Sequence, residues 1–421
     1  MRILYISTYF NGGGAEKVMR QLYYGIKKEN IETYCIVGRL QNNVPGDVEI
    51  IYKDFAGRCI TTMTGGCLNN TIIKTRRAKS EIIKCIKEKK IDIVHFHNLH
   101  SNYIGLLDVE EIRKYCSNIV ITLHDMWMLT GGCAQAFGCE IWKINQYCHS
   151  CKGNESMCKG MHYASLLLKY KICSFKKKGI YFVTPSEWLY DRCRESYLKK
   201  ENIRVISHGI ALEKFICHKK STVRKKYHLP ENKHILLFVA NGIHNVYKGF
   251  PYLQDALQKV ADKEKYALLI VGNGKREKID LPYDLYDIGY IQDEAMLSEM
   301  YAAADLFILP SVADTSSFTA IEAMASGTPV LAFRTGGIPE IVKEDLGWLV
   351  PSQDSKALAD KINDIFLDRK ELERKTALCR QYVEGHYSEG RMLNQYMELY
   401  EEIFTRDRVD DVAVVKSAEK Q

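Results

Sequence analysis

The stretch that decides the fold is DLFILPSVADTSSFTAIEAMASGTPVLAF, residues 305–333. Its apolar run LFIL ends at a proline, and a polar loop follows. Ser316 or Ser317 is suited to cap a helix over FTAIEAMAS, Gly327 to end that helix, and Pro329 to stop its continuation. A second apolar run, TPVLAF, comes directly afterwards. The order strand, helix, strand predicts a parallel β-sheet with a helical crossover.

The same alternation extends along the chain in both directions. Before this stretch lie RILYIS, YCIVG, DIVHFH, NIVITLH, IYFVTPS and IRVISHG, and the second series is ILLFVA, ALLIVG, YDIGYI, LFILPS, TPVLAF and GWLVP. A charged segment that contains a proline separates the two series. We therefore predict an α/β protein with two Rossmann-like, doubly wound domains at residues 1–212 and 233–385, with a linker at 213–232. Residues 406–421 are expected to form a flexible tail.

Two carboxylates stand at the start of the predicted helix. Asp314 lies before it and Glu322 lies about one turn inside it. The free N–H groups of a helix start suit a diphosphate, whereas carboxylates accept hydrogen bonds from sugar hydroxyls. An amphipathic helix with an ordinary serine cap would need neither acid, so this pattern favours a phosphate-and-sugar site.

Other strand ends carry similar features. The loop that follows RILYIS contains Gly13 and Gly14 and leads into a helical pattern, although it lacks the G-x-G-x-x-G spacing of dinucleotide sites. After ILLFVA, a polar loop ends in Lys248, whose ammonium could neutralise a diphosphate. Ligands of doubly wound sheets bind beyond the carboxyl ends of the strands, where all these residues are expected.

The charge of the chain is uneven. The net charge is +7, yet residues 169–226 contain 16 Lys or Arg against 5 Asp or Glu. Such a basic band could bind an anionic membrane surface or nucleic acid, or it could form a solvated face of the protein. Because no RNA-binding or helix-turn-helix motif accompanies it, nucleic acid is the least favoured interpretation. The short apolar start is not typical of a signal peptide, and no apolar run is long enough to span a bilayer. A cytoplasmic protein that touches the inner face of the membrane is the expectation.

Five of the fourteen cysteines are clustered between residues 133 and 158. Four of them could supply thiolates to a structural zinc ion, although the spacing is irregular. Free thiols and redox chemistry are the alternatives. The four candidate ligands are Cys133, Cys139, Cys148 and Cys151.

These motifs resemble those of glycosyltransferase family 4, whose members are retaining enzymes that use nucleotide sugars. The resemblance covers nearly the whole chain and rests on GGGAE, ITLHDMW, VTPSEWL, VYKGF, GYIQDEAMLSEMYAAADLFILPS and IEAMASGTPVLAFRTGGIPEIV. The segment HDMWMLTGGC, with the cysteines after it, is similar to a subgroup from bacterial surface-polysaccharide gene clusters. The resemblance implies the GT-B fold, with two domains facing a central cleft, and a last helix at about 386–405 that returns to the first domain.

The resemblance also implies roles for individual residues. Glu322 should bind the nucleotide ribose, and Asp314 the transferred sugar, aided by the helix start. Lys248 should contact the diphosphate, His124 should lie near the sugar and the acceptor, and Gly13 with Gly14 near both the diphosphate and the acceptor. The residues of the helix start are Ser316, Ser317, Phe318 and Thr319. No divalent metal or other cofactor is implied for catalysis.

His97 allows two interpretations, an acceptor-side polar residue or a structural histidine. Three departures from the family pattern concern the donor: Asp314 stands in place of Glu, Ile243 in place of Arg, and Ser317-Phe318-Thr319 in place of Gly-Phe-Gly. We expect transfer of a sugar to a glycan or a lipid-linked acceptor in capsular, exopolysaccharide or lipopolysaccharide biosynthesis. The alternatives are a nucleotide-sugar 2-epimerase and a non-catalytic nucleotide-sugar-binding protein.

Overall fold

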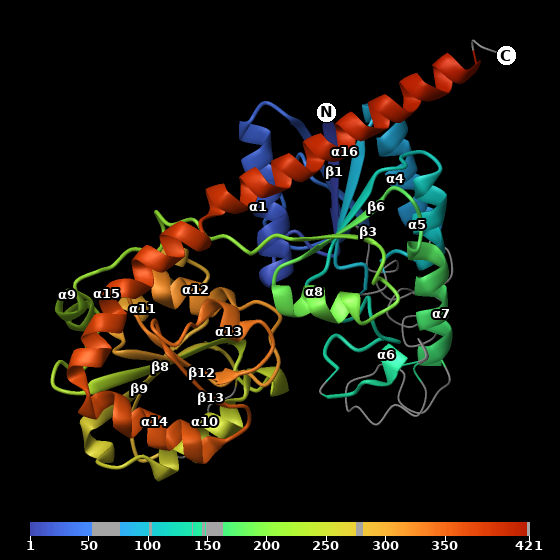
Figure 1. The fold of residues 1–421 in the computed structure, drawn as a ribbon. Helices are drawn as coiled ribbons and strands as arrows, with labels where there is room; N and C mark the ends of the chain where they lie inside the picture. The colour runs from blue at the N-terminus through green and yellow to red at the C-terminus, as the bar shows by residue number, and fades with distance from the viewer. Residues whose placement is uncertain are drawn as a thin grey trace. The chain divides into compact units, whose positions relative to one another are not determined.

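The computed structural model describes residues 1–52, 76–100, 103–136, 138–144, 148, 163–274 and 281–418. The chain divides into two compact units (Figure 1). The first unit combines Met1–Ile206 with Met392–Gln421, and the second is Ser207–Arg391.

The first unit contains a seven-stranded sheet in which every neighbouring pair is parallel. The strand order is β3-β2-β1-β4-β5-β6-β7. The strands are β1 (Arg2–Ser7), β2 (Glu32–Arg39), β3 (Glu49–Tyr52), β4 (Ile93–His97), β5 (Ile119–Thr122), β6 (Ile180–Thr184) and β7 (Asn202–Val205). The helices are α1 (Gly14–Lys28), α4 (Arg76–Lys89), α5 (Leu106–Arg113), α6 (Ile141–Ile144), α7 (Tyr163–Phe175), α8 (Glu187–Arg194) and α16 (Glu389–Ala418).

The two faces of this sheet differ in character because side chains alternate along each strand. One face is apolar and packs Leu4, Val94, Phe96 and Ile121 into the main core of the unit. The opposite face carries Tyr5, His95, His97 and Thr122, all 3% exposed or less. Buried polar side chains need hydrogen-bond partners, so this second face requires specific neighbours.

The second unit contains a six-stranded parallel sheet of order β10-β9-β8-β11-β12-β13, with an apolar core on each face. The strands are β8 (His234–Gly242), β9 (Tyr266–Asn273), β10 (Asp284–Gly289), β11 (Leu306–Leu309), β12 (Val330–Arg334) and β13 (Trp348–Pro351). The helices are α9 (Lys220–Lys226), α10 (Phe250–Lys259), α11 (Glu294–Ala303), α12 (Phe318–Ala325), α13 (Ile338–Ile341), α14 (Ser355–Leu367) and α15 (Arg369–His386), with 3₁₀ turns η1 (Val246–Lys248) and η2 (Lys263–Lys265).

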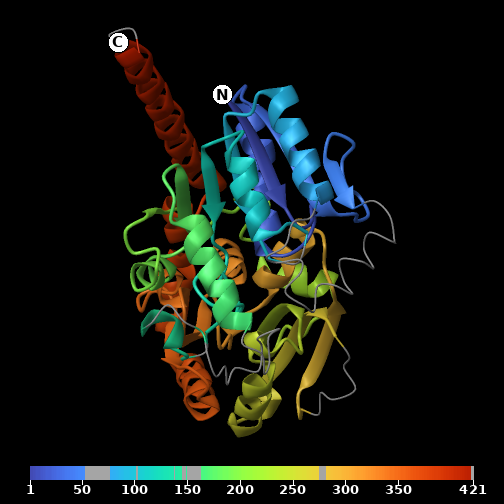
Figure 2. The same ribbon diagram turned by 90° about the vertical axis from the view of Figure 1, so that its right-hand side faces the viewer.

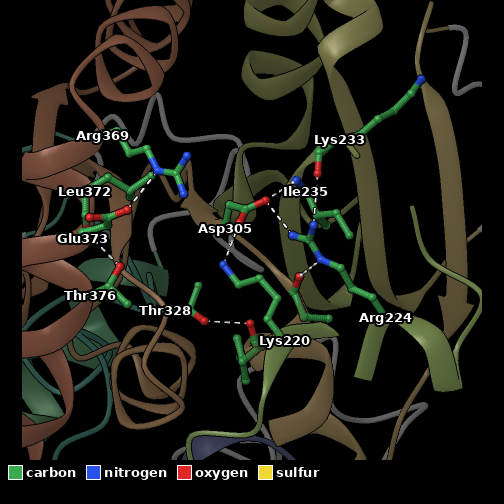
Figure 3. Close-up of polar contacts among 12 residues, drawn as sticks. Lys220, Arg224, Lys233, Ile235, Asp305, Thr328, Arg369, Leu372, Glu373 and Thr376 are labelled. Carbon is green, nitrogen blue, oxygen red and sulfur yellow. Dashed lines mark hydrogen bonds and ion pairs between the residues drawn. The ribbon is translucent and has the colours of Figure 1, made fainter. Parts of the chain in front are cut away.

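The predicted strands of both series are present, and among the described residues β3, at the edge of the first sheet, is the one strand that was not predicted. The predicted linker at 213–232 is wrong, because this stretch belongs to the second unit. Val223 and Arg224 of α9 are 3% and 5% exposed. Lys220 and Arg224 each contact a carboxylate oxygen of Asp305 at 2.6 Å (Figure 3). The segment is charged because its cations meet acids of α11 and Asp305, which directly precedes β11, and not because it faces solvent throughout.

The basic band therefore separates into two parts. Residues 169–206 lie in the first unit, whereas the lysines and arginines from position 214 onward lie in the second. Several of the latter pair with acids, as Lys214 does with Glu294 at 2.8 Å and Lys226 with Glu299 at 2.7 Å. The formal excess of positive charge thus overstates the free charge on either unit.

The helix expected at about 386–405 is longer than predicted. Helix α16 continues without a break to Ala418 (Figure 2), so residues 406–418 are helical where a flexible tail was expected. The sequence of this part contains neither glycine nor proline, the two residues that most strongly interrupt helices. The chain passes from the second unit into the first within the early turns of α16.

Candidate active site

The strand order of the second sheet reverses between β8 and β11. In doubly wound sheets the loops that leave the carboxyl ends of such neighbours diverge, and ligands bind between them. Lys248 follows β8 and Asp314 follows β11. The lysine and the first acid singled out from the sequence thus flank one topological switch point.

The Lys248 Nζ lies 3.0 Å from Asp314 Oδ2, with the side chains 30% and 11% exposed. Close packing of the two loops produces this contact. Gly249 has a φ of 67°, and a Cβ there would lie 1.8 Å from the carbonyl oxygen of Pro310. The Val312 N–H also donates to the Tyr247 carbonyl at 2.9 Å. Only glycine fits at position 249, and its presence brings Lys248 beside the acid.

A third loop, which follows β12, fixes the backbone of Asp314. The Gly337 N–H donates to the Asp314 carbonyl at 3.0 Å. Gly336 has a φ of 55°, and a Cβ there would lie 1.8 Å from the same oxygen. The Thr335 hydroxyl donates to the Val312 carbonyl at 3.1 Å. The side chain of Asp314 is shorter than the Glu of the family pattern. Its backbone is fixed by the contacts of the loop after β12 with the carbonyls of Asp314 and Val312.

Helix α12 starts directly after this loop. Ser317 is its N-cap, and the Ser317 hydroxyl accepts a hydrogen bond from the Ala320 N–H at 3.4 Å. The same hydroxyl lies 3.0 Å from the Thr319 hydroxyl. Phe318 stacks on His208 with a centroid distance of 4.6 Å and an interplanar angle of 8°. The predicted set Ser316–Thr319 thus forms a capped helix start whose aromatic residue is held by His208, a residue that the sequence analysis did not single out.

Glu322 lies inside α12 and is 5% exposed. Its Oε2 accepts a hydrogen bond from the Tyr301 hydroxyl at 3.2 Å. Burial, with the nearby Glu322 charge, raises the pKa of Tyr301 far above its ordinary value, so Tyr301 stays a neutral donor. Tyr301 was missed because it lies 21 residues earlier, on α11.

The arginine position of the family pattern, Ile243, lies in the core. Ile243 is 0% exposed, and a Cβ at Gly274 would lie 2.4 Å from its Cγ1. Its N–H donates to the Asn273 carbonyl at 2.9 Å. This departure replaces a cation by apolar packing between the loops that follow β8 and β9.

The first sheet reverses its order between β1 and β4. Gly13 caps α1 after β1, and both Gly13 and Gly14 are exposed. Glu16, in the first turn of α1, is 8% exposed and accepts from the Asn98 side-chain amide at 3.0 Å. This bond joins the first turn of α1 to the loop after β4, and neither partner was predicted as a site residue from the sequence.

His124 follows β5, and the structure brings it against His97. The His97 Nδ1 lies 3.0 Å from the His124 Nε2, and the rings stack with centroids 5.3 Å apart. His97 is 0% exposed, whereas His124 is half-buried. The burial of His97 favours its structural interpretation over direct contact with an acceptor.

Asp125 and His100 form a second pair beside His124. The His100 Nε2 lies 3.1 Å from Asp125 Oδ2, and Asp125 Oδ1 accepts from the Trp127 N–H at 2.8 Å. Burial lowers the pKa of His100, but the charge of Asp125 and its hydrogen bond together raise it more, so the pKa lies above its ordinary value. Burial raises the pKa of Asp125, but the His100 charge and the hydrogen bonds lower it more. Both residues, with His124, line a small pocket of about 20 Å³.

A buried lysine holds the loop that contains Trp127. Lys171 is 0% exposed, and its ammonium lies 3.4 Å from the centre of the Trp127 ring. It donates to the carbonyls of Trp127 and Thr130, the latter at 2.9 Å. Lys171 thus fixes two backbone carbonyls of the segment HDMWMLT, which follows β5.

Of the four predicted zinc ligands, Cys133, Cys139 and Cys148 are described and Cys151 lies outside the described residues. The Gly131 N–H donates to the Cys148 sulfur at 3.1 Å. Within the part of the chain that the structure describes, no group of three His, Cys, Asp or Glu side chains is arranged to hold a metal. The zinc site remains a prediction.

Comparisons with known proteins agree with this geometry. The family described as glycosyltransferase family 4 matches residues 12–214, and the family described as glycosyl transferases group 1 matches residues 233–368. The chain thus carries two glycosyltransferase domains, one of family 4 and one of group 1. A curated relative of this glycosyltransferase, an uncharacterized 41.2 kDa protein in the cps region of Klebsiella pneumoniae, is 25% identical over 76% of this chain and 81% of its own.

Solved structures show that the glycosyltransferase has the GT-B fold. HepE of Anabaena in complex with UDP-glucose superposes with a TM-score of 0.68 at 15% identity, over 96% of this chain and 100% of that one. WaaG, a glycosyltransferase involved in lipopolysaccharide biosynthesis, superposes with a TM-score of 0.64 at 15% identity, over 91% and 95% of the two chains. Among the described helices, none is long and apolar enough to cross a membrane.

Proposed function

We propose that this glycosyltransferase moves a sugar from a nucleoside-diphosphate sugar to a hydroxyl of a glycan or lipid-linked acceptor, with retention at the anomeric carbon. The observation that supports this most is the contact between Lys248 and Asp314 beside the start of α12. A cation and free helix N–H groups suit a diphosphate, and a carboxylate suits sugar hydroxyls. The complex of HepE with UDP-glucose supports a nucleotide sugar as the donor.

The second unit would hold the donor. Glu322, fixed by Tyr301, would accept hydrogen bonds from the ribose hydroxyls, since an ionised carboxylate is purely an acceptor. Lys248 would neutralise the charge that develops on the leaving diphosphate, together with the positive end of α12. These groups supply the electrostatic stabilisation that a divalent metal provides in other transferases, so we propose turnover without an added metal.

Asp314 would then bind hydroxyls of the transferred sugar. In the proposed same-face route, the bond between the anomeric carbon and the leaving phosphate oxygen breaks as the acceptor oxygen attacks from the same side. The proton of the acceptor hydroxyl passes to the leaving phosphate oxygen. His124 would hydrogen-bond the sugar or the acceptor from the first unit, and Gly13 with Gly14 would allow backbone approach.

We further propose a role in surface-polysaccharide biosynthesis, which the cps region of the Klebsiella relative and the lipopolysaccharide role of WaaG support. A lipid-linked acceptor would place the enzyme in the cytoplasm at the inner face of the membrane. Lys176, Lys177 and Lys178 are exposed and precede β6, whereas His124 follows β5. Because the strands are parallel, the lysines and His124 lie at opposite edges of the sheet. The lysines would therefore hold the enzyme at the membrane by the strand ends away from His124, and the glycan part of a lipid-linked acceptor would have to reach the loops at the other strand ends.

The test is a thermal-shift screen of nucleotide sugars, followed by incubation of each stabilising donor with an acceptor panel and mass analysis. The proposal expects one donor family to raise the melting temperature and to yield a product heavier by one sugar. Formation of an epimer from the donor alone would instead indicate an epimerase. Donor binding without transfer or hydrolysis over the whole panel would indicate a binding protein.

A further inference from the structure

The polar face of the first sheet contains residues that the proposed chemistry does not use. His95 and His97 both lie on β4, and Thr122 ends β5. His97 and Thr122 are opposite one another in the strand register. All three side chains are buried, so their polar atoms require partners within the protein.

Helix α16 provides hydroxyl groups to this face. The Tyr400 hydroxyl lies 2.7 Å from His95 Nδ1, and the Thr122 hydroxyl lies 2.8 Å from His95 Nε2. The Tyr396 hydroxyl lies 2.9 Å from the Thr122 hydroxyl. Tyr396 and Tyr400 are one turn apart and 1% and 0% exposed. Both nitrogens of the His95 ring are thus hydrogen-bonded, one to Tyr400 directly and the other to Tyr396 through Thr122. We refer to these four side chains as the network.

The network reaches His124 by two short paths. Along β5, Thr122 precedes His124 by two residues, so the Tyr396 bond fixes the strand end from which His124 emerges. Through the side chains, the His95 ring contacts the His97 ring with a centroid distance of 4.2 Å, and His97 bonds His124 at 3.0 Å. Burial, with the nearby His124, depresses the pKa of His95, so His95 stays neutral and one of its ring nitrogens donates while the other accepts.

We propose that Tyr396 and Tyr400 are positioning residues for His124. They act through His95, His97 and Thr122 and set the orientation and tautomer of the His124 ring. This inference rests on the proposed function in one respect, namely that His124 belongs to the reaction centre. The hydrogen bond between His97 Nδ1 and His124 Nε2, 3.0 Å long, contains a single proton. A change in the tautomer of His97 therefore changes which nitrogen of His124 carries a proton.

The experiment compares Tyr400→Phe and Tyr396→Phe, each of which removes one hydroxyl and keeps the ring. The matched control is Tyr52→Phe, because Tyr52 is also buried in the first unit, and its hydroxyl donates to the Tyr103 carbonyl at 3.4 Å in the apolar core on the other face. The measurements are side-chain ¹⁵N shifts of His97 and His124, the kcat and the affinity for the donor.

We call Tyr400→Phe and Tyr396→Phe the relay variants. For either of them, the proposal expects altered His124 ¹⁵N shifts and a fall in kcat of about 3- to 30-fold. Donor affinity should stay within about twofold, because Lys248 and Glu322, which are proposed to hold the nucleotide, belong to the second unit. Tyr52→Phe should leave the shifts and kcat unchanged.

Unchanged His124 shifts in both relay variants would overturn the inference, whatever the activity. If His124→Ala retains full transfer activity, the proposed role of His124 in the reaction is wrong. The ¹⁵N shifts would still show whether the two tyrosines set the tautomer of His124. If one relay variant fails to fold, the other provides the same readout.

Discussion

The ammonium of Lys248 and the carboxylate of Asp314 are 3.0 Å apart, so the site carries its own counter-charge before any ligand binds. A diphosphate that engages Lys248 must compete with this carboxylate. The hydroxyls of the donor sugar would in turn compensate Asp314. In the proposed function, the two residues would therefore discriminate between a bare nucleotide and a complete nucleotide sugar.

Replacing Asp314 by Asn should remove the counter-charge and leave Lys248 more available. We expect the affinity for the free nucleoside diphosphate to stay the same or increase, while turnover of the sugar donor falls by about 10- to 100-fold, the effect of one lost charge-assisted hydrogen bond of about 1.5–3 kcal/mol. Calorimetry and steady-state kinetics measure the two effects. A variant that loses diphosphate affinity as strongly as turnover would contradict this division of roles.

Glu322→Ala should show the opposite pattern. Loss of the carboxylate proposed to bind the ribose should weaken binding of the free nucleoside diphosphate by about 10- to 100-fold. Tyr301→Phe keeps the carboxylate and removes only its hydrogen-bond donor, so its effect should be smaller. Titration of both variants with the same nucleotide checks the order. Equal losses in the Asp314 and Glu322 variants would show that the two acids do not have separate roles.

The pair of His100 and Asp125 predicts a pH-dependent contribution to stability. Because the pKa of His100 is raised in the folded protein, its contribution is complete below its ordinary pKa of 6.5 and is lost as the pH rises through the raised value. Because the pKa of Asp125 is lowered, its contribution is complete above 3.8 and is lost as the pH falls through the lowered value. His100→Gln should therefore destabilise the protein more at about pH 5.5 than at about pH 9.

Urea unfolding of the His100→Gln variant and the parent at both pH values measures this difference. His386→Gln is a suitable control, because His386 is exposed and bonds a backbone carbonyl. A destabilisation of the His100 variant that is independent of pH would mean that packing, not charge, accounts for its role.

The cysteine-rich segment predicts bound zinc. If Cys133, Cys139, Cys148 and Cys151 hold a metal, the protein prepared under reducing conditions should contain about one equivalent of zinc per chain. Cys148→Ser should lower this content, whereas Cys217→Ser, at an exposed thiol of the second unit, should not. Elemental analysis decides the matter, and zinc-free parent protein would exclude the site.

The three lysines before β6 predict salt-sensitive binding to anionic vesicles. Each surface lysine contributes about 1 kcal/mol near such a membrane. Changing Lys176, Lys177 and Lys178 together to Glu should release the enzyme from vesicles in a sedimentation assay, while transfer to a short soluble acceptor stays unchanged. Binding that neither the triple change nor added salt reduces would remove these lysines from the membrane contact.

The features predicted from the sequence are those that local chemistry determines. The strand ends, the cap at Ser317, the termination at Gly327 and the acids around the start of α12 all depend on neighbours within a few residues. The features missed depend on distant partners. Arg224 meets Asp305 across 81 positions, which made a packed helix resemble a linker. His95 meets Tyr400 across 305 positions, and the burial of His97 follows from the same face of the sheet.

The place of α16 in the chain has a consequence for biosynthesis. Residues 1–206 leave the ribosome first, but the tyrosines that bond His95 and Thr122 are synthesised only after the whole second unit. During translation, His95 and Thr122 of the nascent first unit can bond each other but therefore lack the hydroxyls of Tyr400 and Tyr396. Since an unsatisfied polar group cannot be buried without a loss of stability, this unit should complete its folding late, and chaperones would have an exposed sheet face to recognise until α16 arrives.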